Sequence, residues 1–258
     1  MHRRGRLAAL LAPALVSTAI AGEIAPLDRR SGFDFMSPET QAMQLDDMAN
    51  PGMLWVLDGE RLWNAPAGNG RSCAACHGDA AASMRGTAAR YPAFDETTGA
   101  PIDLAGRIEQ CREQRQAAPP LGRETGALLS LTAHVANQSR GLLVEPAQDS
   151  RLLPFRERGE RLFERPLGQL GLSCADCHDR HWGQKLGGAP IPQAHPTGYP
   201  IYRLEWQALG SLQRRLRGCM IGVRAEPFAP GAPELIELEL YLMSRAAGLA
   251  MEAPAVRP

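Results

Sequence analysis

Two pentapeptides of the chain, CAACH at residues 73–77 and CADCH at residues 174–178, have the pattern of covalent haem-attachment sites. Two thiols three residues apart can form thioethers with the two vinyl groups of one porphyrin, and the histidine that follows can ligate the iron. A redox C-x-x-C motif needs no histidine, and a zinc site would need its two cysteine pairs much closer together in the sequence. We therefore expect two covalently bound haem c groups. The expected thioether and proximal ligand residues are Cys73, Cys76, His77, Cys174, Cys177 and His178.

The two remaining cysteines, Cys111 and Cys219, each follow one of these motifs and each lie among arginines. Nearby guanidinium groups stabilise a thiolate, so the thiol of Cys219 should ionise easily. Each cysteine could be the distal ligand of its own haem, and would then give that haem a low potential. A disulfide between them is the alternative in an oxidising compartment, but their equivalent positions in two domains favour ligation. The other possible distal ligands are Met84, His134, His181, His195 and Met220.

The N-terminal residues 1–21 have the three parts of a secretory signal peptide: a basic start, a short apolar run interrupted by Pro13, and an Ala-Ile-Ala cleavage site. A membrane anchor is the alternative, but the apolar run is short for one. Cleavage would remove three arginines and no acidic residue, so the net charge would change from 0 to −3. Such a charge does not indicate binding to nucleic acid or to an acidic membrane surface. We expect export to the periplasm, where cysteines can be modified.

The two motifs belong to an internal duplication, because GERLW at residues 59–63 recurs as GERLF at residues 159–163 ahead of the second motif. Each half should contain a helix with this pentapeptide, the C-x-x-C-H motif, a long haem-covering loop and a final amphipathic helix. The final helices are expected over residues 124–139 and 233–248. In a cytochrome c fold the first and last helices cross, and the aromatic residues Trp63 and Phe163 are placed at the crossings.

This pattern predicts a mainly α protein with two cytochrome c-like domains related by internal duplication, and with long haem-covering loops. Residues 95–103 and 186–202 are expected to form such loops without regular structure. The expected division is an N-terminal extension over residues 22–58, a first haem domain over residues 59–145 and a second over residues 146–258. In the extension, Ser37 and Pro38 should begin a helix that Asn50 and Pro51 end.

The chain resembles the SoxA family, the dihaem cytochrome subunits of the SoxAX complexes of sulfur-oxidising bacteria. The resemblance covers essentially the whole expected mature chain and includes both C-x-x-C-H motifs. It also includes RSGFDFMSPETQAMQLDDMANPGMLWVLDGERLW at residues 30–63 and PELIELELYLMSRAAG at residues 233–248. Its most specific part is the R-R-x-R-x-C-x4-R-A-E pattern within YPIYRLEWQALGSLQRRLRGCMIGVRAEPF, residues 199–228.

The resemblance implies an L-cysteine S-thiosulfotransferase, which couples thiosulfate oxidatively to a cysteine of a SoxYZ carrier protein. Two electrons would pass through haem to SoxX, a monohaem cytochrome c that forms a heterodimer with the SoxA subunit. It also implies that His77 and Cys111 are the axial ligands of the first haem, and that His178 and Cys219 are those of the second. Cys219 would be the catalytic residue, as a cysteine persulfide, and Arg215 would bind the substrate. The alternative is a periplasmic dihaem electron-transfer cytochrome without sulfur chemistry.

Overall fold

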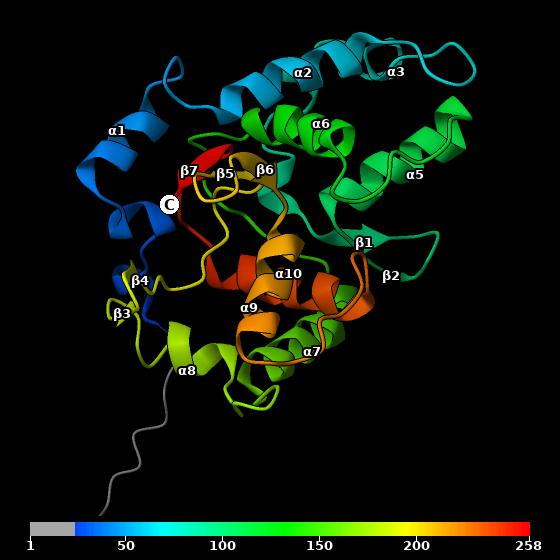
Figure 1. The fold of residues 1–258 in the computed structure, drawn as a ribbon. Helices are drawn as coiled ribbons and strands as arrows, with labels where there is room; N and C mark the ends of the chain where they lie inside the picture. The colour runs from blue at the N-terminus through cyan, green and yellow to red at the C-terminus, as the bar shows by residue number, and fades with distance from the viewer. Residues whose placement is uncertain (1–23) are drawn as a thin grey trace, which may run out of the picture.

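The computed structural model describes residues 24–258, which form an N-terminal extension and two helical halves (Figure 1). The expected signal peptide, residues 1–21, lies outside the described residues. The extension packs on the rest of the chain as predicted, since the Gln44 side chain accepts a hydrogen bond from the backbone N–H of Val256 at 3.1 Å. Its elements are η1 (Pro26–Asp28), η2 (Gly32–Phe35) and α1 (Pro38–Leu45).

Helix α1 begins where the sequence predicted but ends earlier. The hydroxyl of Ser37 caps it and Pro38 is its first residue, as expected. It ends at Leu45, and the Asn50-Pro51 pair instead precedes the next helix, which begins at Gly52. A domain boundary between residues 58 and 59 would therefore fall inside this second helix.

The first half begins with a long helix, continues through the C-x-x-C-H helix and a short hairpin, and ends in two longer helices. Its elements are α2 (Gly52–Asn64), α3 (Cys73–His77), α4 (Ala80–Ser83), η3 (Ala88–Arg90), β1 (Ala93–Asp95), β2 (Ala100–Ile102), α5 (Leu104–Gln116) and α6 (Gly126–Asn137).

The second half repeats this order, so the predicted mainly α, duplicated architecture is confirmed. A final strand, β7, joins the hairpin of this half in a sheet of order β6-β5-β7, in which β5 and β7 are parallel. The elements are η4 (Ser150–Leu152), α7 (Leu153–Glu164), α8 (Cys174–His178), β3 (Lys185–Leu186), β4 (Ala189–Pro190), β5 (Ile201–Arg203), β6 (Ala208–Gly210), α9 (Leu212–Gly222), α10 (Pro233–Arg245) and β7 (Ala255–Arg257).

The segments between each C-x-x-C-H helix and the final helix are more regular than predicted. The expectation that residues 95–103 and 186–202 lack regular structure was wrong, because both contribute strands to hairpins. Strands of two or three residues are too short to show an alternating pattern. Helices α5 and α9, which carry Cys111 and Cys219, were not predicted either. Five of the thirteen residues of α5 are charged, so it has no apolar stripe that would identify a helix.

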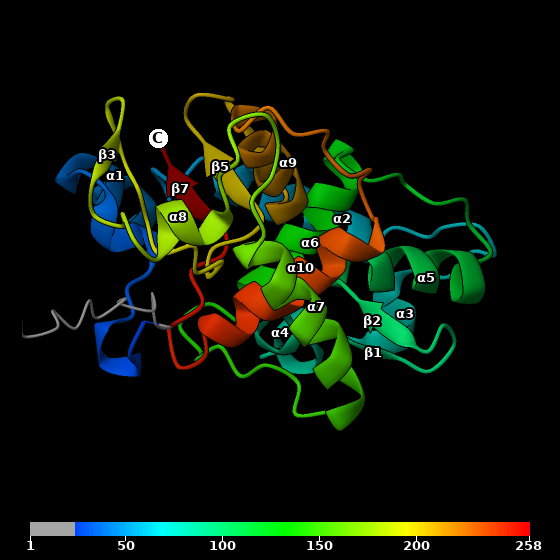
Figure 2. The same ribbon diagram turned by 90° about the horizontal axis from the view of Figure 1, so that it is seen from below.

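The first and last helices of each half cross in close contact, α2 with α6 and α7 with α10 (Figures 1 and 2). A glycine makes each crossing possible. A Cβ atom added to Gly59 would lie 2.1 Å from the carbonyl oxygen of Ser130, and one added to Gly159 would lie 2.0 Å from that of Glu237. These are the first residues of the repeated GERLW and GERLF pentapeptides, so the repeat marks the two crossings.

The aromatic residues of the repeat pack at these crossings, as predicted. The ring of Trp63 lies 5.9 Å from that of His134, and the ring of Phe163 lies 5.4 Å from that of Tyr241. Both aromatic residues are almost fully buried. Each crossing therefore has the same construction, in which glycine brings the backbones together and an aromatic ring fills the space beside them.

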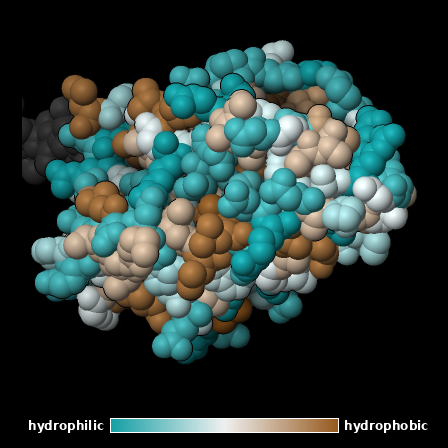
Figure 3. Space-filling model, turned by 90° about the horizontal axis from the view of Figure 1, so that it is seen from above, coloured by the Kyte–Doolittle hydropathy of each residue, from teal (hydrophilic) through white to brown (hydrophobic). Residues whose placement is uncertain are grey.

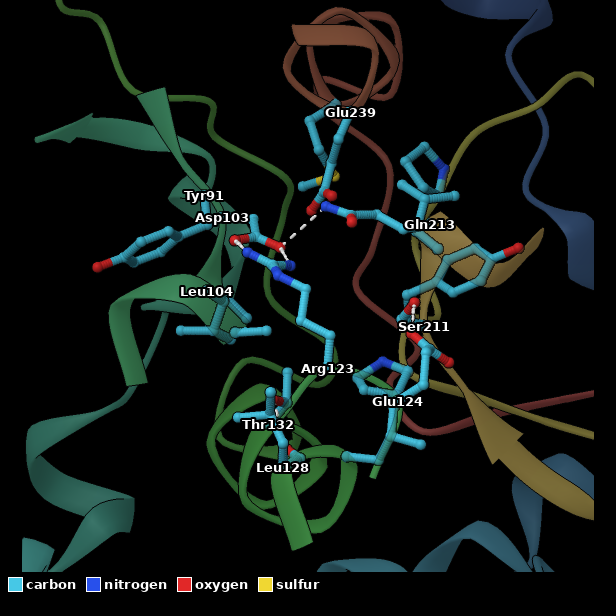
Figure 4. A pocket seen from close by; sticks show the side chains of 18 of the residues that line it. Tyr91, Asp103, Leu104, Arg123, Glu124, Leu128, Thr132, Ser211, Gln213 and Glu239 are labelled. Atoms are coloured by element: carbon cyan, nitrogen blue, oxygen red, sulfur yellow. Dashed lines mark hydrogen bonds and ion pairs between the residues drawn. The ribbon is translucent and has the colours of Figure 1, made fainter. Parts of the chain in front are cut away.

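A buried polar cluster connects the two halves (Figure 4). Asp103 caps α5 and accepts hydrogen bonds from Arg123 at 2.8 Å and from Gln213, in the first turn of α9, at 3.1 Å. The hydroxyl of Ser211 caps α9 and donates to Glu124. The adjacent residues Arg123 and Glu124 thus hold the N-terminal ends of the two helices that carry the unassigned cysteines.

The apolar side chains of the surface are scattered on the face seen from above, where they form separate patches among hydrophilic ones (Figure 3). Within residues 24–258, no helix combines the length and the apolar character that are needed to cross a bilayer.

A methyl group at either crossing glycine should force the paired helices apart. We expect Gly59→Ala and Gly159→Ala each to lower the free energy of unfolding by about 2–3 kcal/mol, as overpacking does, although alanine is the better helix former. Denaturant unfolding of the haem-loaded protein measures this change. Gly188→Ala is the control, because a Cβ atom there meets no atom within 4 Å. Equal stability of all three variants would show that the crossings tolerate the methyl group.

The polar cluster also predicts a pH dependence of stability. Burial, followed by repulsion from Asp103, raises the pKa of Glu239 to about 8 from an ordinary value of 4.5. The folded protein therefore keeps a proton that the unfolded chain releases, so its stability decreases as the pH rises from 4.5 to 8. Glu239→Gln should lose less stability across this window, by at least the ~1.4 kcal/mol that corresponds to one unit of pKa. Urea unfolding at both ends of the window measures the difference, and parallel profiles would exclude Glu239 as the titrating group.

Candidate functional site

The first C-x-x-C-H motif and Cys111 face one cavity of about 310 Å³. Cys73, Cys76 and His77 lie in α3, whose first turn is capped by the hydroxyl of Ser72. Cys111 reaches the same cavity from α5. The structure thus brings together all four residues that the sequence assigned to the first haem.

The second cavity, of about 180 Å³, brings together His178, Cys219 and Arg215. Cys174 packs in the apolar cluster beneath it, together with Leu216 and Leu242, which line the cavity. The helix α8, which holds Cys174, Cys177 and His178, begins with a capping box between Ser173 and Asp176. The predicted catalytic and substrate-binding residues therefore share one cavity with the second histidine.

Both C-x-x-C-H helices are held against a helix crossing, by different contacts. In the first half the indole N–H of Trp63 donates to the carbonyl of Gly78, directly after the motif, at 3.0 Å. In the second half Asp179 takes the place after the motif and forms a buried ion pair with Arg245. The guanidinium of Arg245 lies 4.6 Å from the centre of the Phe163 ring. The aromatic residue of the repeat thus positions the haem-binding segment directly in one half and through an arginine in the other.

The protonation of His178 suits metal binding, whereas burial favours the neutral thiol at Cys111 and Cys174. The Nδ1–H of His178 donates to the carbonyl of Pro192 at 2.6 Å, which leaves Nε2 free for an iron. Burial lowers the pKa of His178 and so favours the neutral imidazole that a metal requires. Burial raises the pKa of Cys111, against the opposing charges of Arg107 and Arg115. It also raises the pKa of Cys174 to about 12, with a further contribution from Cys219, which lies nearby.

The alternative pairing of Cys111 with Cys219 is absent, because all six cysteines are free and these two line different cavities. Of the other distal-ligand candidates, Met84 lines the first cavity and His195 the second. His195 donates through Nδ1 to the carbonyl of Arg30 at 2.7 Å, and its buried Nε2 has no hydrogen-bond partner.

Three further candidates lie away from both cavities. Met220 is 4% exposed and packs in the apolar core of the second half. His134 packs at the first helix crossing, and His181 hydrogen-bonds to the backbone carbonyl of Asp176. Neither histidine lines the first or the second cavity.

Several residues of the second cavity were missed by sequence reasoning. Three come from the N-terminal extension and two from the end of the chain, and both segments are distant in sequence from the motif. Arg203 could have been found by aligning the two halves, because residues 91–111 and 199–219 align at a constant offset of 108. The missed residues include Gly32, Phe35, Met36, Arg203, Arg257 and Pro258, whereas Tyr199 lies in the loop that was expected to cover the haem.

A family model described as SoxA/TsdA, cytochrome c domain, matches residues 58–144 and 158–251. The chain belongs to the SoxA/TsdA cytochrome c family. L-cysteine S-thiosulfotransferase subunit SoxA of Pseudaminobacter salicylatoxidans is 37% identical over 94% of this chain and 86% of its own length. The protein of the same name from Paracoccus pantotrophus is 34% identical over 88% of this chain and 78% of its own. A crystal structure of SoxXA from P. pantotrophus matches with a TM-score of 0.86 at 34% identity, over 89% of this chain and 87% of that chain.

This SoxA-family chain therefore has the cytochrome c fold that the resemblance implied, and its cofactor is covalently bound haem c. The described residues fit that cofactor. Each cavity meets a histidine from a C-x-x-C-H helix and a cysteine from a second helix, which are donors suited to haem iron.

The two sets of haem-binding residues predict the mass of the intact protein and its electron paramagnetic resonance spectrum. If both are occupied, the intact protein should weigh two haems more than its peptide, and a mass with one haem would contradict the first site. Electron paramagnetic resonance should show low-spin haem with a thiolate ligand, which differs from His/Met or bis-His haem. Cys111→Ala and Cys219→Ala should each remove one thiolate component, and the double variant both. A spectrum unchanged by either substitution would exclude that cysteine as a ligand.

Proposed function

We propose that this SoxA-family chain is the catalytic subunit of a periplasmic L-cysteine S-thiosulfotransferase. The reaction is S2O3²⁻ + carrier–SH → carrier–S–S–SO3⁻ + H⁺ + 2 e⁻. One sulfur–sulfur bond forms, the thiol proton goes to solvent, and two electrons pass to a cytochrome c acceptor. The observation that carries the proposal is the presence of Cys219, His178 and Arg215 in one cavity of a chain whose relatives are named for this activity.

Arg215 is the proposed substrate-binding residue. Arg215 lines the cavity with Cys219, and its guanidinium group has no ion-pair partner among the described residues. An uncompensated guanidinium in a partly buried cavity attracts anions, and its fork of N–H donors suits the oxygens of a sulfonate group. Arg215 would therefore hold the sulfonate end of thiosulfate and direct its outer sulfur toward Cys219.

Cys219 is the proposed catalytic residue, with a cysteine persulfide as its reactive form. It is half-buried in α9, between the exposed Gly218 and the buried Met220. Cys219 lines the second cavity together with Leu216 and Arg215, so its thiol lies beside both an apolar and a cationic side chain. Haem bound in this cavity would supply an acceptor for the electrons of the reaction.

The proposed haem ligands follow the two cavities. The first haem, in residues 59–145, would be attached to Cys73 and Cys76 with axial ligands His77 and Cys111. The second, active-site haem, in residues 146–258, would be attached to Cys174 and Cys177 with axial ligands His178 and Cys219. Residues 22–58 form the proposed extension.

The proposed partners are a SoxX-type monohaem cytochrome c, in a heterodimer, and a SoxYZ-type carrier protein that supplies the acceptor cysteine. The similar structure from P. pantotrophus is titled SoxXA, which supports the first of these. The reaction and the expected signal peptide, residues 1–21, both suit the periplasm.

Removing the thiol of Cys219 distinguishes this enzyme from an electron-transfer cytochrome. Cys219→Ala should abolish turnover with thiosulfate, by about 100-fold or more, because it deletes the proposed reactive sulfur. The assay reconstitutes the protein with partner cytochrome and carrier, and haem content is measured by mass. Cys111→Ala is the matched comparison, which removes the equivalent thiol of the other half and should retain turnover. Turnover of Cys219→Ala at the unsubstituted rate would eliminate the catalytic role.

A further inference from the structure

The two halves share one frame around their unassigned cysteines. In each half a three-residue strand leads through a hairpin to a helix, and residues 91–111 align without a gap with residues 199–219, at an offset of 108. Arg107 and Arg215 occupy the same place in this frame, four residues before Cys111 and Cys219. Both arginines line the cavity of their own half.

The strand residue near this arginine is negatively charged in the first half and positively charged in the second. In the first half the last residue of β1 is Asp95, which is 1% exposed and accepts a hydrogen bond from Arg107 at 3.0 Å. Asp95 is further held by hydrogen bonds from Thr98 and Gln110. In the second half the same strand position is Arg203. The first arginine is thus neutralised by a buried carboxylate, whereas the second shares its cavity with another arginine.

The two arginines of the second half line one cavity and have little counter-charge, although Arg203 also stacks on the ring of Trp206 at 5.2 Å. Arg203 and Arg215 both line the cavity that Cys219 faces. Arg203 has one ion pair, at 2.7 Å, with Glu205, a residue whose side chain is 53% exposed. Its buried Nε–H has no hydrogen-bond partner. Burial, followed by the charge of Arg215, lowers the pKa of Arg203, as expected for neighbouring cations.

Two like charges in a partly buried cavity are costly unless an anion joins them. We propose that Arg203 and Arg215 together form a binding site for a divalent oxyanion, with Arg203 as a second thiosulfate-binding residue. This inference rests on the proposed function and extends it. It also explains the difference between the halves. In the first half the carboxylate of Asp95 occupies the equivalent place and pairs with Arg107, so no anion can bind there.

A propionate of the bound haem offers the same chemistry as the sulfonate group of thiosulfate. The first cavity contains further arginines, Arg112 and Arg115, but these follow Cys111 along α5. Arg203 and Arg215 precede Cys219. The excess positive charge of the second half therefore lies where the first half has the ion pair of Arg107 with Asp95, and so no excess charge. Both halves are expected to hold a haem with propionates, so a charge found only in the second half favours thiosulfate as its ligand. The binding experiment must separate the two anions.

The experiment measures thiosulfate binding to the haem-loaded protein without carrier, by titration of the haem absorption and electron paramagnetic resonance spectra. Arg203→Gln removes the charge, and Arg203→Asp recreates the ion pair of the first half. We expect the Kd for thiosulfate, and its KM in the reconstituted assay, to rise about tenfold to a hundredfold, with a smaller change in kcat. Arg214→Gln is the matched control, because Arg214 stacks on Trp206 as Arg203 does but does not line the cavity.

The outcomes separate the inference from the function on which it rests. A raised Kd in Arg203→Gln, with the potential of the second haem unchanged and Arg214→Gln normal, supports the inference. An unchanged Kd together with a shifted haem potential would assign Arg203 to a propionate and overturn it. If the unsubstituted protein turns over thiosulfate but both Arg203 variants keep its Kd and KM, only the inference is wrong. If the unsubstituted protein shows no turnover, the proposed function itself is wrong.

Discussion

The close crossing of the first and last helices is the constraint on which each half depends. At Gly59 and Gly159 the helix backbones approach to a distance that leaves no room for a Cβ atom. The aromatic residue four positions later fills the space beside the contact and connects, directly or through Arg245, to the residue after the C-x-x-C-H motif. Backbone contact is therefore what places the haem-attachment helix relative to the rest of the domain.

A second set of contacts places the cysteines that face the attached groups. Helices α5 and α9 each begin at a side-chain cap, Asp103 and Ser211. Arg123 and Glu124 bind one cap each, so neighbouring residues connect the two helix ends. The two cavities are thus built on one frame, and a difference in their chemistry has to arise from individual side chains. The exchange of Asp95 for Arg203 is such a difference, since it changes the charge beside an otherwise equivalent arginine.

The second cavity is completed by the two ends of the described chain. Gly32, Phe35 and Met36 of the extension line it together with Arg257 and Pro258. Strand β7 holds this end in place by pairing with β5, and the extension is held in turn by the contact of Gln44 with Val256. The first cavity has no contribution from either segment among its described lining residues. These two segments line the second cavity in addition to the elements that the duplication gives both halves.

The sequence by itself determined the haem chemistry, the duplication and the family, because each depends on short contiguous patterns. C-x-x-C-H needs only five residues, and the GERLW repeat and the arginine-rich segment around Cys219 are also local. The helix crossings could be predicted because these motifs indicate a cytochrome c fold, in which the first and last helices cross. The repeat also predicted that Cys111 and Cys219 belong to different halves, and they line separate cavities. Tertiary structure alone decided that the extension lines the second cavity and that Arg203 shares it with Arg215. These contacts join residues that are far apart in the chain. The strands that carry some of them are too short, and α5 is too polar, to be recognised from their composition.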